Sequence, residues 1–219
     1  MAETQRNARS ASKVIEDKDY VFTGTVDFTG ATTGISRTEL DEDSLAVYTL
    51  KPEDWRKFDD MDAILPTTPL SDDLGLVHGT FGTNSPTLQT EDHKANGAAT
   101  ANKARITFAL PPEYVSGGTI TIRAHCGMKT TIADQAATID FSCYASDEEE
   151  GISADLVTTA ATAMNSVTLA DKDFAVTATG RAAGDLLDIQ VTTSVDDDAT
   201  GTAVIGLIGA VKILLDVKG

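Results

Sequence analysis

Apolar and polar residues alternate along most of the chain after residue 73, in short runs separated by glycine, proline or acidic turns. The clearest run is Asp185–Val195, in which Leu187, Ile189 and Val191 share one face and polar residues share the other. Successive side chains of a β-strand point to opposite faces, so a period of two is typical of a half-buried strand. The run therefore predicts a strand with one face toward a core.

The last run, Thr202–Val217, is apolar on both faces in its middle. Two arrangements give this pattern: an interior strand covered on both sides, and a strand whose outer face meets another chain. Its two glycines remove side chains where a second backbone or sheet can come close. For the second arrangement, the predicted subunit-interface residues are Val204, Gly206, Leu207, Gly209 and Val211.

Similar strand patterns recur upstream, with turn residues between them. The further predicted strands are Leu74–Phe81, Ala104–Leu110, Thr119–Gly127, Thr138–Tyr144, Leu156–Ala160, Ser166–Leu169 and Asp173–Gly180. For Leu156–Ala160, a turn of helix is the alternative. About eight strands at this spacing, without βαβ alternation, are typical of a β-sandwich and not of an α/β enzyme. We predict an all-β fold in which residues 74–219 form a jelly-roll-like antiparallel β-sandwich.

The first 73 residues have a different character. Residues 1–19 are polar and charged, and the glycine-punctuated segment that follows predicts one or two short strands. We predict an extended N-terminal arm over residues 1–35 and a small subdomain or linker over residues 36–73. Within the latter, Leu45–Leu50 is a candidate strand, and Pro52 suits the first turn of a short helix.

Two connections between the predicted strands attract attention. The polar segment Gly82–Asn102 is long for a loop in a compact domain, which favours a functional loop. The turn Asp196–Asp198 is acidic, and we interpret it as a solvated hairpin turn; wrapping a cation is the alternative.

Cys126 and Cys143 fall in phase with the core faces of their strands, which favours buried free thiols over a disulfide between neighbouring strands.

The charge of the chain restricts its partners. The net charge is −17, which argues against nucleic-acid binding, because phosphate contacts require lysine and arginine. Arg6, Arg9 and Lys13 nevertheless make the N-terminus basic, which indicates either a docking segment or a frayed terminus. The first ten residues lack the apolar region of a signal peptide, and the longest apolar run is too short to span a bilayer. We therefore expect no membrane contact and synthesis in a cytoplasm.

The sequence offers no constellation that defines a reaction. None of the three histidines, His78, His93 and His125, has metal-ligand spacing, and His125 is expected on the outer face of its strand. Nucleophile-elbow and phosphate-loop motifs are missing from the sequence. An aromatic fraction of 5% argues against both a glycosidase and a sugar-binding face. We therefore predict a protein that is not an enzyme and requires no cofactor or metal.

Several segments resemble virion proteins of tailed bacteriophages. Near the N-terminus this holds for Gly24–Thr32, with the sequence Gly-Thr-Val-Asp-Phe-Thr-Gly-Ala-Thr. Further on, the segment around Leu110-Pro111-Pro112, the following Thr-Ile-Thr-Ile-Arg strand, the stretch Gly184–Val195 and the closing Ile-Leu-Leu-Asp-Val-Lys-Gly are similar to β-sandwich domains of the capsid decoration or cement class. In that class, trimers sit where capsomers meet and N-terminal arms extend over the shell.

The resemblance implies a function and a set of partners. We expect a structural virion protein on the capsid exterior that binds the major capsid protein, bridges capsomers as a homo-oligomer, preferably a trimer, and docks through Arg6, Arg9 and Lys13. The alternative is a head-fibre or receptor-binding appendage whose loops, chiefly Gly82–Asn102, meet a cell surface. A remote alternative is a β-sandwich enzyme that degrades polysaccharides.

Overall fold

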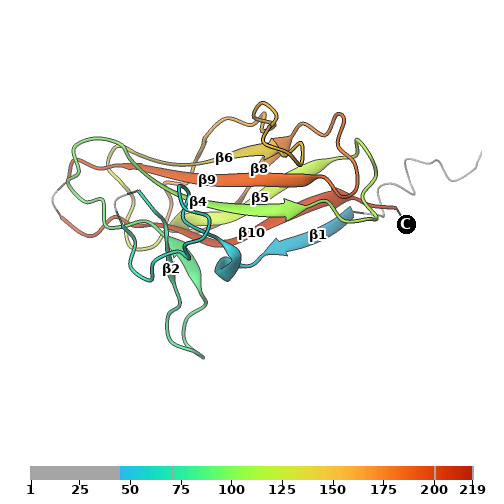
Figure 1. The fold of residues 1–219 in the computed structure, drawn as a ribbon. Helices are drawn as coiled ribbons and strands as arrows, with labels where there is room; N and C mark the ends of the chain where they lie inside the picture. Colours follow the sequence, from blue (N-terminus) through green and yellow to red (C-terminus); the bar gives the residue numbers. More distant parts are fainter. Residues whose placement is uncertain (1–44, 71, 200, 219) are drawn as a thin grey trace, which may run out of the picture. The chain divides into compact units, whose positions relative to one another are not determined.

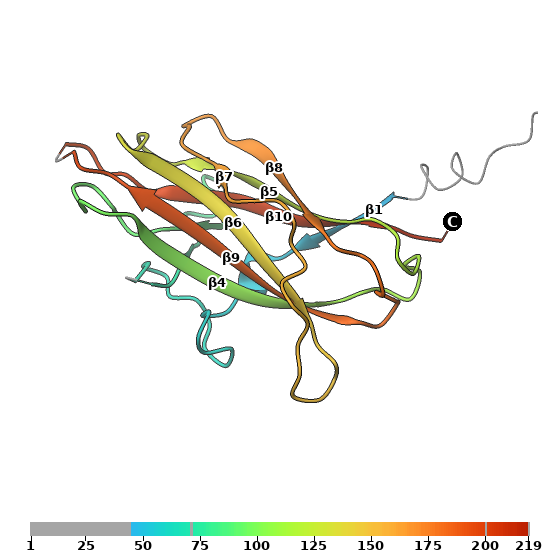
Figure 2. The same cartoon turned by 90° about the horizontal axis from the view of Figure 1, so that it is seen from above.

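The alternating runs form the strands of two antiparallel sheets packed face to face (Figures 1 and 2). The computed structural model describes residues 45–70, 72–199 and 201–218. The all-β, jelly-roll-like sandwich predicted from the sequence is confirmed. The predicted arm over residues 1–35 lies outside the described residues.

The first sheet, sheet A, has the strand order β2–β3–β10–β5–β8, and β1 also pairs with β10. Its strands are β1 (Leu45–Leu50), β2 (Gly75–Val77), β3 (Thr87–Gln89), β5 (Ile120–Met128), β8 (Ala170–Val176) and β10 (Gly206–Asp216). β10 is therefore an interior strand: β5 pairs along one side, while β3 and β1 share the other side end to end.

The second sheet, sheet B, has the order β4–β9–β6–β7. Its strands are β4 (Thr100–Ala109), β6 (Ala136–Ala145), β7 (Thr162–Ala163) and β9 (Leu186–Asp196). β9 pairs over ten residues with β4 and over ten with β6, so it forms the middle of the sheet. Its buried residues are the ones whose alternation predicted a strand, including Leu187, Ile189 and Val191.

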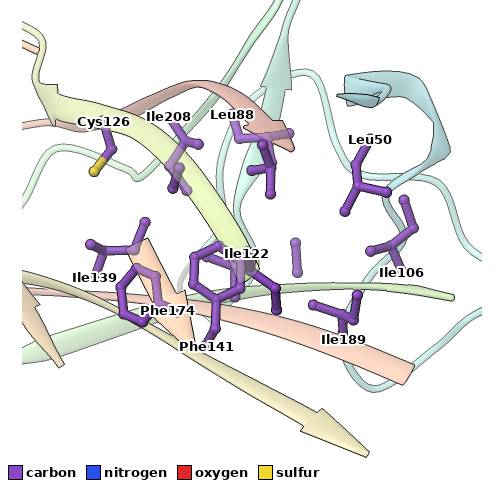
Figure 3. Close-up of a cluster of buried hydrophobic side chains, with 14 of the residues drawn as sticks. Leu50, Leu88, Ile106, Ile122, Cys126, Ile139, Phe141, Phe174, Ile189 and Ile208 are labelled. Carbon is purple, nitrogen blue, oxygen red and sulfur yellow. The ribbon is translucent and has the colours of Figure 1, made fainter. Parts of the chain in front are cut away.

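The core lies between the inner faces of the two sheets (Figure 3). Phe141 of β6 and Phe174 of β8 meet there, with their ring centroids 4.9 Å apart at an interplanar angle of 57°. Tilted aromatic pairs of this kind contribute stability beyond the area they bury. The two rings therefore join sheet B to sheet A at one side of the core.

Residues 45–70 belong to the sandwich, which corrects the prediction of a separate subdomain or linker over residues 36–73. β1 pairs with β10 over six residues, from Leu45↔Asp216 to Leu50↔Val211. The short 3-10 helix η1 (Pro52–Asp54) then leads to Trp55, whose side chain is 1% exposed. The acidic composition and the prolines suggested a linker. Composition does not reveal a strand partner that lies at the other end of the chain, as β10 does for β1.

The segment after η1 protects the edge of sheet B. Arg56 exchanges both backbone hydrogen bonds with Arg105 of β4, and Lys103 of the same strand is bonded to Asp72 and Leu74. Open strand edges are prone to unwanted pairing, and coverage by other parts of the chain is one way to protect them. At the opposite side of the sandwich, backbone bonds between residues 156–158 and β8 have the same effect.

Two connecting regions differ from the strand predictions. The predicted loop Gly82–Asn102 contains β3 and ends inside β4, so it is not one continuous loop. Between residues 150 and 170 the structure has only β7, instead of strands at Leu156–Ala160 and Ser166–Leu169. Here a few backbone bonds are supplemented by side chains: Thr159 Oγ1 accepts from Ala175 N–H, and Asp155 Oδ1 accepts from Cys143 N–H.

Both cysteines are buried and free, as expected from their phase. Burial raises the pKa of the Cys126 thiol to about 11 and that of Cys143 to about 12, because the thiolate loses its hydration. The reactive thiolate is therefore scarce at neutral pH. Among the described residues, no helix is long and apolar enough to cross a membrane.

We expect native protein to react negligibly with a thiol reagent such as 5,5′-dithiobis(2-nitrobenzoate) at pH 8, and unfolded protein to release two thiol equivalents. The measurement is the absorbance of the released chromophore with and without guanidinium chloride. Rapid reaction of the native protein would contradict the burial of the two thiols.

The Phe174→Ala variant should lose about 3–5 kcal/mol of unfolding free energy, because it removes a fully buried ring and leaves a cavity beside Phe141. Urea denaturation followed by circular dichroism measures the change. The matched control is Val167→Ala, at a side chain that is 56% exposed, which should change stability by less than about 0.5 kcal/mol. Equal effects of the two substitutions would contradict the assigned core.

Candidate functional site

The five predicted interface residues do not share one surface. Val204, Gly206 and Val211 are buried inside the sandwich, whereas Leu207 and Gly209 lie half-buried on the outer face of sheet A. Three of the five are thus core residues, which agrees with the interior-strand interpretation and corrects the interface prediction for those three. Whether the outer face of β10 meets a second subunit stays a prediction.

Both glycines of β10 have reasons within the chain. A Cβ at Gly206 would lie 3.1 Å from Thr90 Cγ2, and the Gly206 N–H donates to Thr90 Oγ1. Gly209 lies where the register with β5 shifts between Ile208 and Ala210, a β-bulge. A glycine that admits a neighbouring segment of the same chain looks, in the sequence, the same as one that admits a second subunit. The predicted docking residues Arg6, Arg9 and Lys13 lie outside the described residues.

The histidines take structural positions. His125 lies on the outer face of β5, as predicted, with Nδ1 2.7 Å from Asp171 Oδ1. His93 is instead buried, with Nε2 2.6 Å from Oδ1 of the buried Asn102. The amide of Asn102 donates in turn to the carbonyl oxygens of Leu70 and Asp73. This buried polar network joins the segment before β2 to β4.

The acidic turn after β9 is not merely solvated. Asp197 is 1% exposed, and its carboxylate accepts hydrogen bonds from the backbone N–H groups of Ala95 and Asp134. The Asp197 N–H donates to Asn96 Oδ1. The carboxylate thus joins three loops at one end of the sandwich, which corrects the solvated-turn interpretation. In the parts of the chain that the structure describes, no three His, Cys, Asp or Glu residues are grouped to hold a metal ion.

We expect the Asp197→Asn variant to lose part of the acid sensitivity of unfolding. The backbone N–H donors of Asp134 and Ala95 lower the pKa of Asp197 in the folded state. Because the pKa of Asp197 is lower in the folded state than in the unfolded state, its ionised carboxylate stabilises the fold at pH values above the unfolded-state pKa, near 3.9. This stabilisation is lost as the pH falls through the pKa of the folded state. Chemical denaturation between pH 7 and pH 2 measures the difference. Parallel pH profiles for wild type and variant would contradict this role.

The clearest unsatisfied surface is the outer edge of β1. Both backbone groups of Asp216 bond on the β5 side, to Thr119 and Val115. Asp216 therefore makes no backbone bond to its partner Leu45, whose own N–H and C=O groups point away from β10. Because this direction alternates along a strand, the backbone groups of Val47 also point away from β10. These groups form an open strand edge within the described residues. The side chains of Leu45 and Val47 are also about half exposed.

A groove of about 420 Å³ runs between this edge and β4. The rings of Tyr48 and Phe108 meet edge to face on it, with centroids 5.8 Å apart, and Leu50 and Ile106 also line it. The backbone groups of Arg105 point to the outer edge of β4, where they bond to Arg56. Two residues further along, the backbone groups of Thr107 point to the same edge and have no partner among the described residues. Two open edges thus flank an apolar floor, which we name the β1–β4 groove.

A second exposed feature is the hairpin that joins β2 to β3, which projects from the sandwich in Figure 1. Phe81 at its tip is fully exposed. Backbone bonds from Thr83 and Asn84 to Thr80 order the tip, and Gly79 and Gly82 adopt positive φ. The predicted strand Leu74–Phe81 included Phe81, so its exposure was not expected. The signal was present, since glycines flank an aromatic residue in a polar segment.

The comparisons with known proteins place the chain in no family. No family model matches the sequence, and no curated protein matches it. Among solved structures, TmCBM61 in complex with β-1,4-galactotriose matches at 10% identity over 78% of this chain and 84% of its own, with a TM-score of 0.30. The CBM36-1 domain of a xylanase from the hindgut metagenome of Trinervitermes trinervoides matches at 12% identity over 77% and 95%, with a TM-score of 0.33.

An apo cyclase from Fischerella sp. matches at 13% identity, over 81% of this chain and all of its own, with a TM-score of 0.39. These similarities are distant in both sequence and geometry.

Proposed function

We propose that the chain is a structural accessory protein of a tailed-phage virion that decorates the outside of the capsid and stabilises it by bridging capsomers. The observation that carries the proposal is the β1–β4 groove, where an open strand edge lies beside an apolar floor. Such an edge accepts an extended segment of a partner as an added strand, with affinity from main-chain hydrogen bonds. The partner is a segment of the major capsid protein.

The side chains around the groove support a specific attachment. β1 has the sequence Leu-Ala-Val-Tyr-Thr-Leu and contains neither proline nor charge, the two common protections of an edge strand. Lys51, Arg56 and Asp54 line the groove, and the hydroxyl group of Tyr48, which also lines it, donates to Glu113 Oε1. Charges of both signs are therefore available to a partner. An incoming strand with alternating apolar residues and charged flanks fits these features.

Other elements of the proposal come from the sequence. Arg6, Arg9 and Lys13 would lie along the shell and add contacts to those of the groove. A homotrimer would repeat the attachment at each capsomer junction, with the outer face of β10 at Leu207 and Gly209 as the remaining candidate for subunit contact. The acidic surface would keep decorated particles apart.

A second candidate function is a head-fibre or receptor-binding appendage. The exposed Phe81 on an ordered, projecting hairpin favours it, because aromatic side chains are frequent anchors of protein interfaces. Copy number separates the two functions. A decoration protein is present in proportion to the capsomers of purified particles, whereas an appendage has the much lower copy number of a single tail or vertex.

We expect Val47→Lys to weaken binding of the purified protein to undecorated shells by at least about tenfold, because a charged side chain on the β1 edge opposes strand addition. Cosedimentation of protein with shells measures the affinity. The matched control is Val167→Lys, since Val47 and Val167 are each 56% exposed and Val167 lies away from the groove. Equal binding of the two variants would contradict attachment through the β1 edge.

Deletion of residues 1–19 tests the arm separately. We expect loss of shell binding with no change in the unfolding transition of the sandwich. Full binding by the truncated chain would contradict a docking role of Arg6, Arg9 and Lys13 while leaving the β1–β4 groove to be judged by Val47→Lys.

A further inference from the structure

The outer face of sheet B contains a small cleft that the proposed attachment does not use. Its volume is about 190 Å³. Three strands of the sheet and two flanking segments contribute its lining residues: Phe58, Arg105, Tyr144, Ile152, Asp188 and Gln190.

Strand register brings the polar residues of the cleft together. Arg105 of β4 lies opposite Gln190 of β9, and Asp188, two residues earlier on β9, lies opposite Tyr144 of β6. Arg105 Nε donates to Asp188 Oδ1 at 2.7 Å, and a second guanidinium N–H donates to Oδ2. A bidentate pair of this kind fixes the orientation of the guanidinium plane. The sheet thus holds a rigid polar floor.

The floor retains hydrogen-bonding capacity after these contacts. Asp188 occupies the Nε edge of the Arg105 guanidinium, and Nη1 has no partner among residues 45–70, 72–199 and 201–218. Gln190 lines the cleft, and its Nε2 donates to Thr192 Oγ1, which leaves Gln190 Oε1 as an acceptor with no partner among the described residues. A donor and an acceptor are therefore available within one small site, with the Tyr144 hydroxyl as a third polar group.

Apolar groups form the rest of the cleft. Phe58, Tyr144 and Ile152 come from three separate segments, and Ile152 is largely exposed. Lys103 Nζ lies 4.4 Å from the centroid of the Phe58 ring, which holds that ring in place by a cation–π contact. Tyr144 is the aromatic ring that remains to contact a ligand. Concave sites that combine apolar contacts with a few fixed polar groups are typical of ligand-binding sites.

Size and charge restrict the ligand. Pockets for drug-sized ligands have volumes of about 300–1,000 Å³, so this cleft holds no more than a single ring or side chain. Asp188 neutralises Arg105, so the cleft itself presents no net charge to hold an ion of either sign. The net charge of −17 on the whole chain further disfavours an anion. A neutral ring that presents both C–H groups and hydroxyl groups matches the lining.

We propose that this cleft binds one neutral sugar unit of a polysaccharide, with Tyr144 against the ring and with Arg105 and Gln190 bonded to its hydroxyl groups. The low aromatic content argued against a sugar-binding face. Composition counts aromatic residues but does not locate them, and two of the few present, Phe58 and Tyr144, meet at this cleft. Sugar binding at this cleft does not depend on where the protein resides, and it would add a weak attachment to glycans to the proposed structural role.

The test is a titration of the full chain with glucose, galactose, mannose, xylose and glucuronate, followed by ligand-observed saturation-transfer NMR. We expect saturation by at least one neutral sugar with a Kd on the order of millimolar, the weak range expected for a single ring, and weaker binding of glucuronate. Tyr144→Ala should reduce the affinity at least about tenfold. Ile152→Asp provides a second variant at an exposed rim position, where folding is not at risk, and it should also weaken binding.

A second bidentate arginine–aspartate pair, which lies outside the cleft, serves as a control. Arg123 on the outer face of sheet A donates to Asp173 through bonds of 2.6 and 2.7 Å, the same bidentate geometry as in the Arg105–Asp188 pair. Arg123→Ala should leave sugar binding unchanged. Absence of binding by every neutral sugar, preference for glucuronate, or wild-type affinity of the Tyr144→Ala and Ile152→Asp variants would overturn the proposal. None of these results would affect shell binding through the β1–β4 groove.

Discussion

The pairing of β10 with three strands at once is the constraint on which sheet A depends. β5 pairs along one side of β10, and the other side is divided between β3, at Leu207–Ile208, and β1, from Val211 onward. The bulge at Gly209 lies in the interval between those two partners. An extra residue in a strand bends it and increases its twist. Because β10 bends at this bulge, β3 and β1 can pair with it without lying on one straight line. The outer edge of β3 is paired with β2, whereas that of β1 has no strand partner among the described residues.

Local pattern was enough to predict the elements whose burial follows strict alternation. Asp185–Val195 is the best example, because Leu187, Ile189, Val191 and Val195 are all fully buried in β9. The positions of Cys126 and Cys143 followed from the same reasoning. Pattern failed at β3 and at residues 150–170, where strands are two or three residues long or are replaced by a few backbone and side-chain hydrogen bonds. Such short elements depend on their partners and carry little periodicity of their own.

The polar positions were the least predictable from sequence. Asp197 looked like a surface aspartate in an acidic turn, yet it is buried as an acceptor for donors from two other loops. His93 and Asn102 looked like loop residues, and they form a buried network. A buried polar group is stable only when its hydrogen bonds are satisfied, and its partners here come from distant segments. The cleft on sheet B was likewise not predictable from local sequence, because three strands and two connecting segments that are separated along the chain form it.

The partnership between β1 and β10 also bears on how the chain acquires its fold. Leu45 pairs with Asp216, so the first described strand must wait for the last one. Contacts between residues far apart in sequence close large loops and form slowly, since the entropy of closure is lost before the contact stabilises the chain. During synthesis, sheet A lacks its interior strand until residues Gly206–Asp216 have been made. Throughout that interval β1 has no strand partner and β5 has only β8, so a folding helper that shields the open edges of these two strands would increase the yield of native protein.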